Sequence, residues 1–278
     1  MADILDYGKL GMGTWFLGEP SGNRTEETAA LRYGLERGIR IIDTAEMYGS
    51  GRSERLVGEA VRPFARDKLF LVSKVLPSNA NRRNMEHSLD ASLKALQTDY
   101  LDLYLYHWRG GTPLEETVEM LENMAAKGKI RTWGVSNFDL EDMEELLALE
   151  HGANCRTNQV LYHLGSRGIE VALKPFQDAH GIPIMAYCPL AQAGTLRDGL
   201  TEHPAVRRLA AELCISVYQV LLCFTLAQSN TVSIPRTGKT AHMKEIADCL
   251  DIRLNAEQLA LLDDAFPKPP YRVPLDVE

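Results

Sequence analysis

Short apolar runs rich in β-branched residues alternate with longer helical patterns along the whole chain of 278 residues. Eight strand-like runs recur at roughly one per 35 residues, near the ~30 that a strand–helix–strand unit needs. No glycine–serine linker or change in composition divides the chain. The pattern predicts one (β/α)8 TIM barrel domain over residues 1–278. The predicted strands cover 9–14, 39–43, 69–74, 101–107, 132–136, 158–161, 183–187 and 232–235.

The helical segments carry leucine, methionine and alanine at spacings of three and four residues, which is typical of helices packed on a sheet. The first is predicted over 25–38, with Thr25 as its cap and Gly38 at its end. The stretch from Thr112 to Glu115 predicts a capping box, with proline at the first helical position, and a helix to about Lys127. The other helices are predicted over 53–64, 82–96, 139–149, 169–180, 217–228, 241–250 and 255–266.

The competing architecture is an open, doubly wound sheet, which needs a Gly-x-Gly-x-x-Gly turn after its first strand. Here Gly11-Met-Gly13 lacks the third glycine and runs into Gly18-Glu-Pro rather than into a helix. The barrel is therefore the favoured fold.

Composition excludes several classes of protein. The formal net charge is −8, and the only clustered basic residues are Arg82-Arg83 and Arg207-Arg208 on apparent helices, so nucleic acid is not an expected partner. No apolar run is long enough to span a bilayer, and the first residues show no export signal. The five cysteines never form Cys-x-x-Cys, which disfavours zinc and predicts free, mostly buried thiols in a reducing cytoplasm.

Four reactive side chains lie at or near consecutive predicted strand ends. Asp43 ends the second strand, Lys74 the third and His107 the fourth, and Tyr48 lies in the second loop. Because all strands of a barrel end at one mouth, we expect these groups to lie together. Each alone has a structural explanation, but as a set they favour proton transfer. A metal is disfavoured, since one aspartate and one histidine stand beside a lysine that repels cations.

The later strand ends carry different groups. Amides and a hydroxyl stand at Ser136-Asn137 and Asn158-Gln159, and Tyr187 offers an aromatic face for stacking. The stretch from Arg236 to Lys239 brings cations and a hydroxyl near a helix start, where phosphate can bind. One half of the mouth thus suits proton transfer and the other a phosphorylated aromatic cofactor. This division suggests hydride transfer to a carbonyl.

Taken in order, these residues resemble the aldo-keto reductase superfamily, and the likeness covers nearly the whole chain. One such motif is weak support, whereas the ordered set is strong. The segment Asn158-Gln-Val-Leu-Tyr-His-Leu resembles bacterial members that reduce small aldehydes. The matching motifs are Ile42-Asp-Thr-Ala-Glu-Met-Tyr48-Gly, Leu71-Val-Ser-Lys74, Asp102-Leu-Tyr-Leu-Tyr-His107-Trp, Gly134-Val-Ser-Asn-Phe138, Asn158-Gln159 and Ser233-Ile-Pro235.

The resemblance implies a parallel barrel that binds NADPH in extended form and reduces aldehydes or ketones to alcohols. Tyr48 would donate the proton to the carbonyl oxygen, with Lys74 as its cationic neighbour. Asp43 would be the partner of the lysine, and His107 would orient the substrate oxygen. Because a phenol starts near a pKa of ~10, we expect the nearby ammonium to lower the pKa of Tyr48.

The same resemblance assigns a cofactor site. Ser136, Asn137 and Gln159 would hold the carboxamide, and Tyr187 would stack on the nicotinamide. Leu190 and the loop after it would lie near the pyrophosphate. The other residues expected at the cofactor are Thr14, Trp15, Cys188, Pro189, Ile234, Pro235, Arg236, Thr237, Gly238, His242 and Glu245.

Departures from the family pattern concern the adenosine end. Arg236-Thr237 replaces the usual Lys-Ser, and His242 stands where an arginine typically holds the ribose 2′-phosphate. Glu245 keeps the adenine-amide role, while Ile246 replaces an asparagine. Arg236 still offers a charged, bidentate guanidinium. We therefore expect NADPH (NADP+) to be preferred over NADH by a modest margin.

Trp15, Phe16 and Trp108, together with Tyr48, are expected to line an apolar substrate pocket, although core filling explains Trp15 equally well. The segment after Phe266 is short, so we expect it to cover little of the mouth. An open pocket predicts small aldehydes and α-dicarbonyls such as methylglyoxal as substrates.

Two other functions stay open. Some members of the family that this sequence resembles are cofactor-binding regulatory subunits without physiological turnover. The presence of all four expected catalytic residues favours an enzyme instead. A metal-dependent barrel hydrolase is the third class. We expect a monomer in the cytoplasm, with a weak dimer as the alternative and a small carbonyl compound as the partner.

Overall fold

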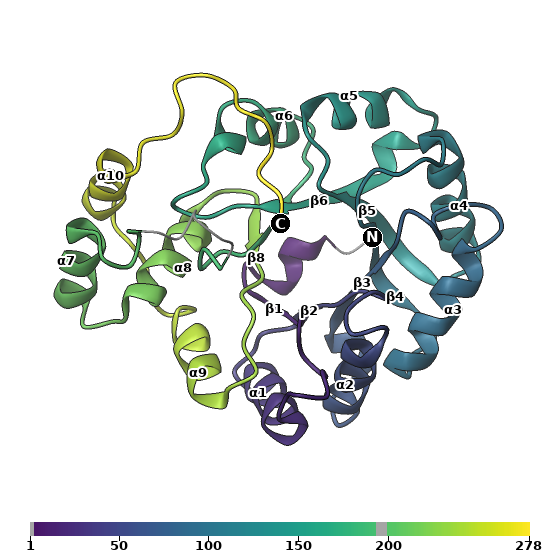
Figure 1. Cartoon of the computed structure of the whole chain (residues 1–278), viewed down its shortest axis with the longest axis horizontal. Helices are drawn as coiled ribbons and strands as arrows, with labels where there is room; N and C mark the ends of the chain where they lie inside the picture. Colours follow the sequence, from purple (N-terminus) through teal and green to yellow (C-terminus); the bar gives the residue numbers. More distant parts are fainter. Residues whose placement is uncertain (1–2, 193–198) are drawn as a thin grey trace.

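The computed structural model, which describes residues 3–192 and 199–278, contains eight parallel strands in the order β1 to β8. Bridges from Leu10 to Ser233 and from Gly13 to Arg236 join the first strand to the last. The predicted (β/α)8 barrel is confirmed, and its strands form the inner ring of Figure 1. The strands are β1 (Gly11–Gly13), β2 (Ile41–Asp43), β3 (Phe70–Val75), β4 (Leu101–Tyr106), β5 (Ile130–Ser136), β6 (Cys155–Leu161), β7 (Ile184–Tyr187) and β8 (Thr231–Ser233).

Helices form the outer ring around the strands (Figure 1). Four short 3-10 helices in the described residues are η1 (Ile4–Tyr7), η2 (Arg66–Lys68), η3 (Gly152–Asn154) and η4 (Gly168–Glu170). The α-helices are α1 (Arg24–Glu36), α2 (Arg52–Val61), α3 (Met85–Leu96), α4 (Leu114–Ala126), α5 (Leu140–Ala148), α6 (Leu173–Ala179), α7 (Pro204–Leu213), α8 (Val217–Ala227), α9 (Thr240–Asp248) and α10 (Ala256–Ala265).

The barrel has two separate apolar layers. Side chains that point inward, such as Ile41, Val72 and Leu105, fill its interior, and Ile4 from η1 packs against them. A much larger cluster lies between the strands and the outer helices. Because alternate strand residues face these two layers, the strands are buried on both sides and read as continuous apolar runs. The polar residues at the strand ends are thereby held on a rigid frame.

The first helix begins earlier than the sequence pattern predicts. Asn23, not Thr25, is its cap, and the Asn23 side chain accepts a hydrogen bond from the backbone N–H of Glu26 at 3.2 Å. Thr25 therefore lies inside the first turn. Gly38 follows the helix with a φ of +97°, a conformation that glycine adopts without strain.

The predicted capping box at Thr112 is wrong. Helix α4 begins at Leu114, Pro113 occupies the cap position, and no side chain caps this end. In the first turn of α4, the hydroxyl of Thr117 donates to the carbonyl of Ala80 at 2.9 Å, which ties this end of the helix to the loop before α3. The pattern from Thr112 to Glu115 could not reveal this tertiary contact, because Thr117 and Ala80 are 37 positions apart.

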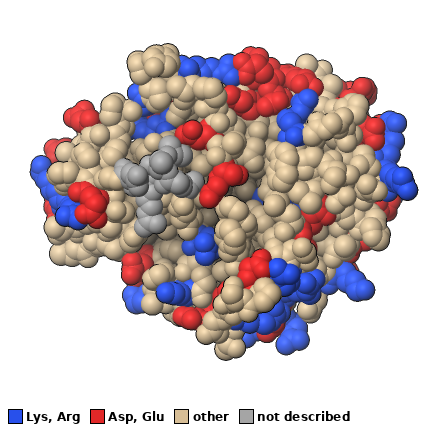
Figure 2. All heavy atoms as spheres, in the orientation of Figure 1, with Lys and Arg blue, Asp and Glu red and all other residues tan. Residues whose placement is uncertain are grey.

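The seventh crossover holds two helices, α7 and α8, of which the sequence pattern delimited only the second. Within the described residues no single helix is long and apolar enough to cross a membrane. The pair α7 and α8, bent by 93°, reaches that length and composition only when both are counted together. On the face seen in Figure 2, acidic and basic side chains are interspersed.

The capping contacts give a stability prediction. Asn255 caps α10 in a reciprocal capping box with Gln258, so we expect Asn255→Ala to cost about 1 kcal/mol of stability. Thr112→Ala is the matched control, and we expect a change below about 0.5 kcal/mol because Thr112 caps nothing. Urea unfolding of both variants followed by circular dichroism measures the difference. Equal losses in the two variants would contradict this account of the caps.

Candidate active site

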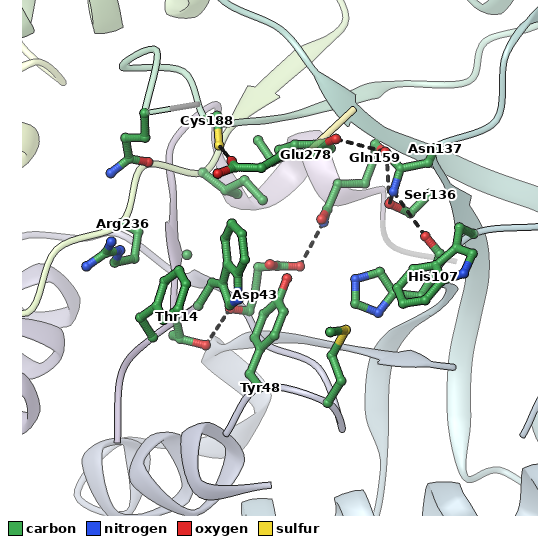
Figure 3. A pocket seen from close by; sticks show the side chains of 18 residues that line it. Thr14, Asp43, Tyr48, His107, Ser136, Asn137, Gln159, Cys188, Arg236 and Glu278 are labelled. Atoms are coloured by element: carbon green, nitrogen blue, oxygen red, sulfur yellow. Dashed lines mark hydrogen bonds between the residues drawn. The ribbon is translucent and has the colours of Figure 1, made fainter. Parts of the chain in front are cut away.

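A pocket opens where the strands end at their carboxyl termini, and Figure 3 shows the side chains that point into it. Residues from seven different strand ends and loops meet there, as the barrel geometry requires. The residues predicted from the sequence that line this pocket are Thr14, Trp15, Phe16, Asp43, Tyr48, His107, Trp108, Ser136, Asn137, Gln159, Tyr187, Cys188, Ile234 and Arg236.

A buried ion pair lies beneath the pocket floor. The ammonium Nζ of Lys74 is 2.8 Å from Oδ2 of Asp43 and 2.9 Å from the carbonyl oxygen of Thr44. The same nitrogen donates to the hydroxyl of Tyr48 at 3.0 Å. Lys74 is fully buried and Asp43 is 2% exposed. The three groups thus form one connected unit between β2, β3 and the loop after β2.

The ionisation of this unit differs from the expectation. Burial and the nearby carboxylate of Asp43 raise the pKa of Tyr48 well above its usual value, so the ammonium does not lower it. Burial also lowers the pKa of Lys74, while Asp43 opposes that shift. The predicted contact between the Lys74 ammonium and the Tyr48 phenol is present. Its predicted lowering of the Tyr48 pKa is outweighed by burial and by Asp43. The phenol of Tyr48 consequently keeps its proton at neutral pH.

His107 lies beside the phenol and carries no charge. Its ring centroid is 5.9 Å from that of Tyr48, with the rings nearly perpendicular. Burial, reinforced by the charge of Lys74, lowers the pKa of His107 to about 2. Its Nδ1 has no hydrogen-bond partner among the described residues. A neutral imidazole has one donor and one acceptor nitrogen, so it can position a polar substrate atom.

Amides and hydroxyls form the opposite wall. Ser136 donates to the backbone carbonyl of Gln159 at 2.9 Å, and the amide of Asn137 donates to the backbone carbonyl of His107 at 3.2 Å. Tyr187 donates its hydroxyl proton to Oδ1 of Asn137 at 2.9 Å. These bonds hold the amides rigidly at the ends of β5, β6 and β7.

Gln159 connects the two walls. Its Nε2 donates to Oδ1 of Asp43 at 2.8 Å, across 116 positions of sequence. Asp43 therefore receives one hydrogen bond on each carboxylate oxygen, from Lys74 and from Gln159. No feature of the sequence indicates this contact, because Asp43 and Gln159 lie 116 positions apart and belong to different motifs. One N–H of the Gln159 amide is committed to the ion pair.

The loop after β1 supplies a further wall. The hydroxyl of Thr14 donates to the backbone carbonyl of Asp43 at 2.8 Å, and Ser53 donates to Thr14. The rings of Trp15 and Phe16 stack with centroids 4.5 Å apart. Phe16 is 53% exposed, so this aromatic pair faces the pocket and solvent rather than the core. Trp15 is thus a pocket residue, one of the two readings that its sequence context allowed.

A second pocket adjoins the first and holds the residues expected at an adenosine. Arg236 and Gln192 line both pockets, so the two lie next to each other. Glu245 accepts a hydrogen bond from the hydroxyl of Ser216 at 2.9 Å, which fixes its carboxylate. The predicted residues that line this pocket are Leu190, Arg236, Thr237, His242 and Glu245.

Three of the predicted cofactor residues line neither pocket, and the predicted catalytic residue Lys74 lies beneath the first pocket without lining it. Pro189 and Pro235 are buried, and the carbonyl of Pro235 accepts from the backbone N–H of Gly13 at 2.9 Å. Gly238 packs so close to Glu27 that an added Cβ would lie 2.9 Å from its Cγ. Their contact with a cofactor stays a prediction. The loop after Leu190 was expected near a pyrophosphate, and residues 193–198 of it lie outside the described residues.

Several pocket residues were missed. Gly13, Met47, Gln192 and Glu278 line the first pocket, and Met47 is an exposed apolar residue at its rim. Met47 could have been found, because it directly precedes Tyr48. The second pocket adds Ser216, Tyr218, Gln219, Leu222, Ile246 and Cys249.

The expectation that the segment after Phe266 covers little of the mouth is wrong. Glu278 lines the first pocket, and its Oε2 accepts from the thiol of Cys188 at 3.2 Å. Figure 1 shows this segment returning from α10 to the barrel centre. Its shortness was misleading, because an extended chain covers ~3.3 Å per residue and twelve residues suffice to reach the mouth.

The other chemical expectations concern cysteines and metals. All five cysteines are free, and Cys155, Cys188, Cys223 and Cys249 are buried, as predicted, whereas Cys214 is exposed. Within residues 3–192 and 199–278 no three histidine, cysteine, aspartate or glutamate side chains form a group that could hold a metal ion.

Several known proteins are similar to this chain in sequence or in fold. The chain is 49% identical over 268 residues to methylglyoxal reductase YeaE of Escherichia coli K12, covering 96% of the chain and 94% of that protein. It is 34% identical to glyoxal reductase of Bacillus subtilis over 87% of the chain and 84% of that protein.

A crystal structure of an aldo/keto reductase from Klebsiella pneumoniae with NADP and acetate matches with a TM-score of 0.94. Its sequence is 49% identical, and the match covers 97% of this chain and 95% of that one. The family model for aldo/keto reductases matches residues 9–266. The chain therefore belongs to the aldo/keto reductase family of oxidoreductases.

Proposed function

We propose that this protein reduces small aldehydes and α-dicarbonyls to alcohols with NADPH, and that Tyr48 donates the proton to the carbonyl oxygen. The observation that carries the proposal is the 3.0 Å hydrogen bond from Nζ of Lys74 to the hydroxyl of Tyr48 at the pocket floor. A reduced carbonyl gains a hydride at carbon and a proton at oxygen. An enzyme of this kind needs a protonated donor that can become an anion during the reaction.

Lys74 and Asp43 give Tyr48 these two properties. The raised pKa of the phenol keeps it protonated before the reaction. Once the proton has left, the phenolate lies within hydrogen-bonding distance of the Lys74 ammonium, which stabilises the new negative charge. Asp43 holds that ammonium in place and in its charged form. The phenolate then regains a proton from solvent through the open pocket.

His107 is proposed to orient the carbonyl oxygen toward the phenol. Its low pKa keeps the ring neutral, so it contributes a hydrogen bond rather than a competing acidic proton. Its position edge-on to Tyr48 supports this role.

The residues of the two pockets fit NADPH. Tyr187, Asn137 and Ser136 in the first pocket suit a nicotinamide ring with its carboxamide. Arg236, Thr237 and Glu245 in the second suit a phosphorylated adenosine, and the shared lining by Arg236 and Gln192 allows one extended molecule to reach both. NADPH, when bound there, supplies the hydride. Structures of similar Klebsiella pneumoniae proteins with NADP and with NADPH support this assignment.

The pocket rim supports small substrates. Trp15, Phe16, Met47 and Trp108 bring apolar surface close to Tyr48 and His107. The names methylglyoxal reductase and glyoxal reductase of the two relatives point to the same class of compound.

A substrate panel with both nicotinamides tests the proposal. We expect kcat/KM to be higher for short aldehydes and α-dicarbonyls than for bulky ketones, because the aromatic rim limits the space above Tyr48. We also expect NADPH to exceed NADH by roughly tenfold, or about 1.4 kcal/mol, since Arg236 keeps a guanidinium for the phosphate. Loss of NADPH absorbance measures each rate. High activity on bulky ketones alone, or equal efficiency with the two nicotinamides, would contradict these expectations.

Tyr48→Phe tests the proton donor. We expect turnover to fall by roughly 10²- to 10⁴-fold, the usual contribution of a positioned acid, with NADPH binding nearly unchanged. Steady-state rates and fluorescence titration with NADPH separate the two effects. Tyr7→Phe is the matched control, because Tyr7 packs on Phe70 at the opposite end of the barrel. Normal turnover by the Tyr48 variant would require another proton donor.

The pKa shifts give a pH prediction. Tyr48 stays protonated below its raised pKa, and His107 stays neutral above a pKa of about 2. Neither group therefore changes charge near neutral pH, and we expect kcat/KM for reduction to be flat from about pH 6 to about pH 9. A pH profile with saturating NADPH measures this. A decline centred near pH 6 to 7 that disappears in His107→Gln would show that the histidine titrates in that range.

A further inference from the structure

Residues 267–278, here called the mouth segment, are fastened to the top of the barrel at three points. Arg272 pairs with Glu141 and lies 3.3 Å from Asp139. The backbone N–H of Leu275 donates to Asp139 at 3.4 Å. Asp276 accepts a hydrogen bond from Ser166 at 2.5 Å. These contacts come from the N-terminus of α5 and from the loop after β6.

The fastened segment brings Glu278 onto the wall that the proposed function assigns to the nicotinamide. Its side-chain Oε2 accepts from the thiol of Cys188 at 3.2 Å, and Glu278 lines the same pocket as Tyr187. Figure 3 shows the Glu278 carboxylate inside the pocket beside Cys188. Cys188, the neighbour of Tyr187 in the chain, is therefore already in contact with the mouth segment.

Charge makes this placement unfavourable for NADPH. The cofactor carries several negative phosphate charges, and a carboxylate in a partly buried site repels them more than one in open water. Arg236 lines the same pocket and would be shared between Glu278 and the phosphates. Glu278 and Tyr187 line the same pocket, so the Glu278 side chain takes up room beside the ring on which a nicotinamide would stack.

We propose that the mouth segment occupies part of the cofactor site in the free protein, and that NADPH binds only when Glu278 leaves Tyr187 and Cys188. This inference rests on the proposed function. The apparent affinity for NADPH is then reduced in proportion to the population in which the segment is docked. The contacts of Arg272 and Asp276 with the barrel set that population, although both lie outside the pocket.

Two variants separate displacement of the segment from a simple charge effect. Glu278→Gln removes the carboxylate and keeps the fastening points. Arg272→Ala loosens the segment at a distance and makes the protein more negative, which by charge alone would weaken binding of an anion. We expect both to lower the Kd for NADPH roughly three- to tenfold.

The measurement is a fluorescence or calorimetric titration of the purified full chain with NADPH, without substrate. Glu257→Gln on α10 and Arg82→Ala before α3 repeat the two charge changes at exposed positions, and we expect neither to change the Kd. If Arg272→Ala does not fold, Asp276→Asn replaces it, because this change weakens another fastening point. We expect the same decrease in the Kd for NADPH.

The outcomes are distinct. Tighter binding by both the charge variant and the fastening variant supports displacement of the segment. Tighter binding by Glu278→Gln alone, or no change in either, overturns the inference while leaving the proposed function intact. Failure of every protein, including the natural one, to bind NADPH would overturn the proposed function and the inference with it.

Discussion

The hydrogen-bonded ion pair of Lys74 and Asp43 is the interaction on which the mouth of this barrel depends. Both groups are removed from water, a state that is costly unless each charge is paired and its remaining hydrogen bonds are made. Asp43 meets that condition through Lys74 and Gln159, and Lys74 through Asp43, Thr44 and Tyr48. Removing one partner of such a pair typically costs about 3–5 kcal/mol, because the other charge stays buried alone. The pair therefore fixes the relative positions of β2, β3 and β6.

Hydrogen bonds connect the two halves of the mouth. Tyr48 and His107 lie on one side, and Ser136, Asn137 and Tyr187 lie on the other. Gln159 links them, since its side chain donates to Asp43 while its backbone carbonyl accepts from Ser136. A group held by the amides is thus placed relative to the phenol through two hydrogen bonds and the rigid strands beneath. Such a short, buried connection suits a reaction in which a hydride and a proton must reach neighbouring atoms.

The pKa of Tyr48 is raised rather than lowered, and this changes the role that Lys74 can have. A lysine beside a tyrosine is usually expected to lower the pKa of the phenol. Here burial and the carboxylate of Asp43 have the larger effect, and they raise it. In the proposed mechanism, Lys74 therefore stabilises the Tyr48 phenolate after proton transfer and does not acidify the phenol before it. The mouth segment adds another negative group, Glu278, to the same cavity. The electrostatic potential in this pocket therefore depends on two carboxylates, Asp43 and Glu278, and on two cations, Lys74 and Arg236. No single ion pair determines it.

The sequence by itself determined the eight-fold alternation of strand and helix, the family, and most of the residues that line the pockets. Periodicity and strand-end position are local properties, so Asp43, Lys74, His107 and the Ser136-Asn137 pair could be placed at one mouth without coordinates. Only the tertiary structure decided that Thr112 caps no helix and that Thr117 bonds to Ala80, whereas the cap of α1 is a local contact of Asn23 with Glu26. It alone joined Gln159 to Asp43 across 116 positions and Glu278 to Cys188 across 90. Such contacts leave no periodic trace in the chain, because they depend on how distant backbones are brought together and on how much water is excluded when they meet.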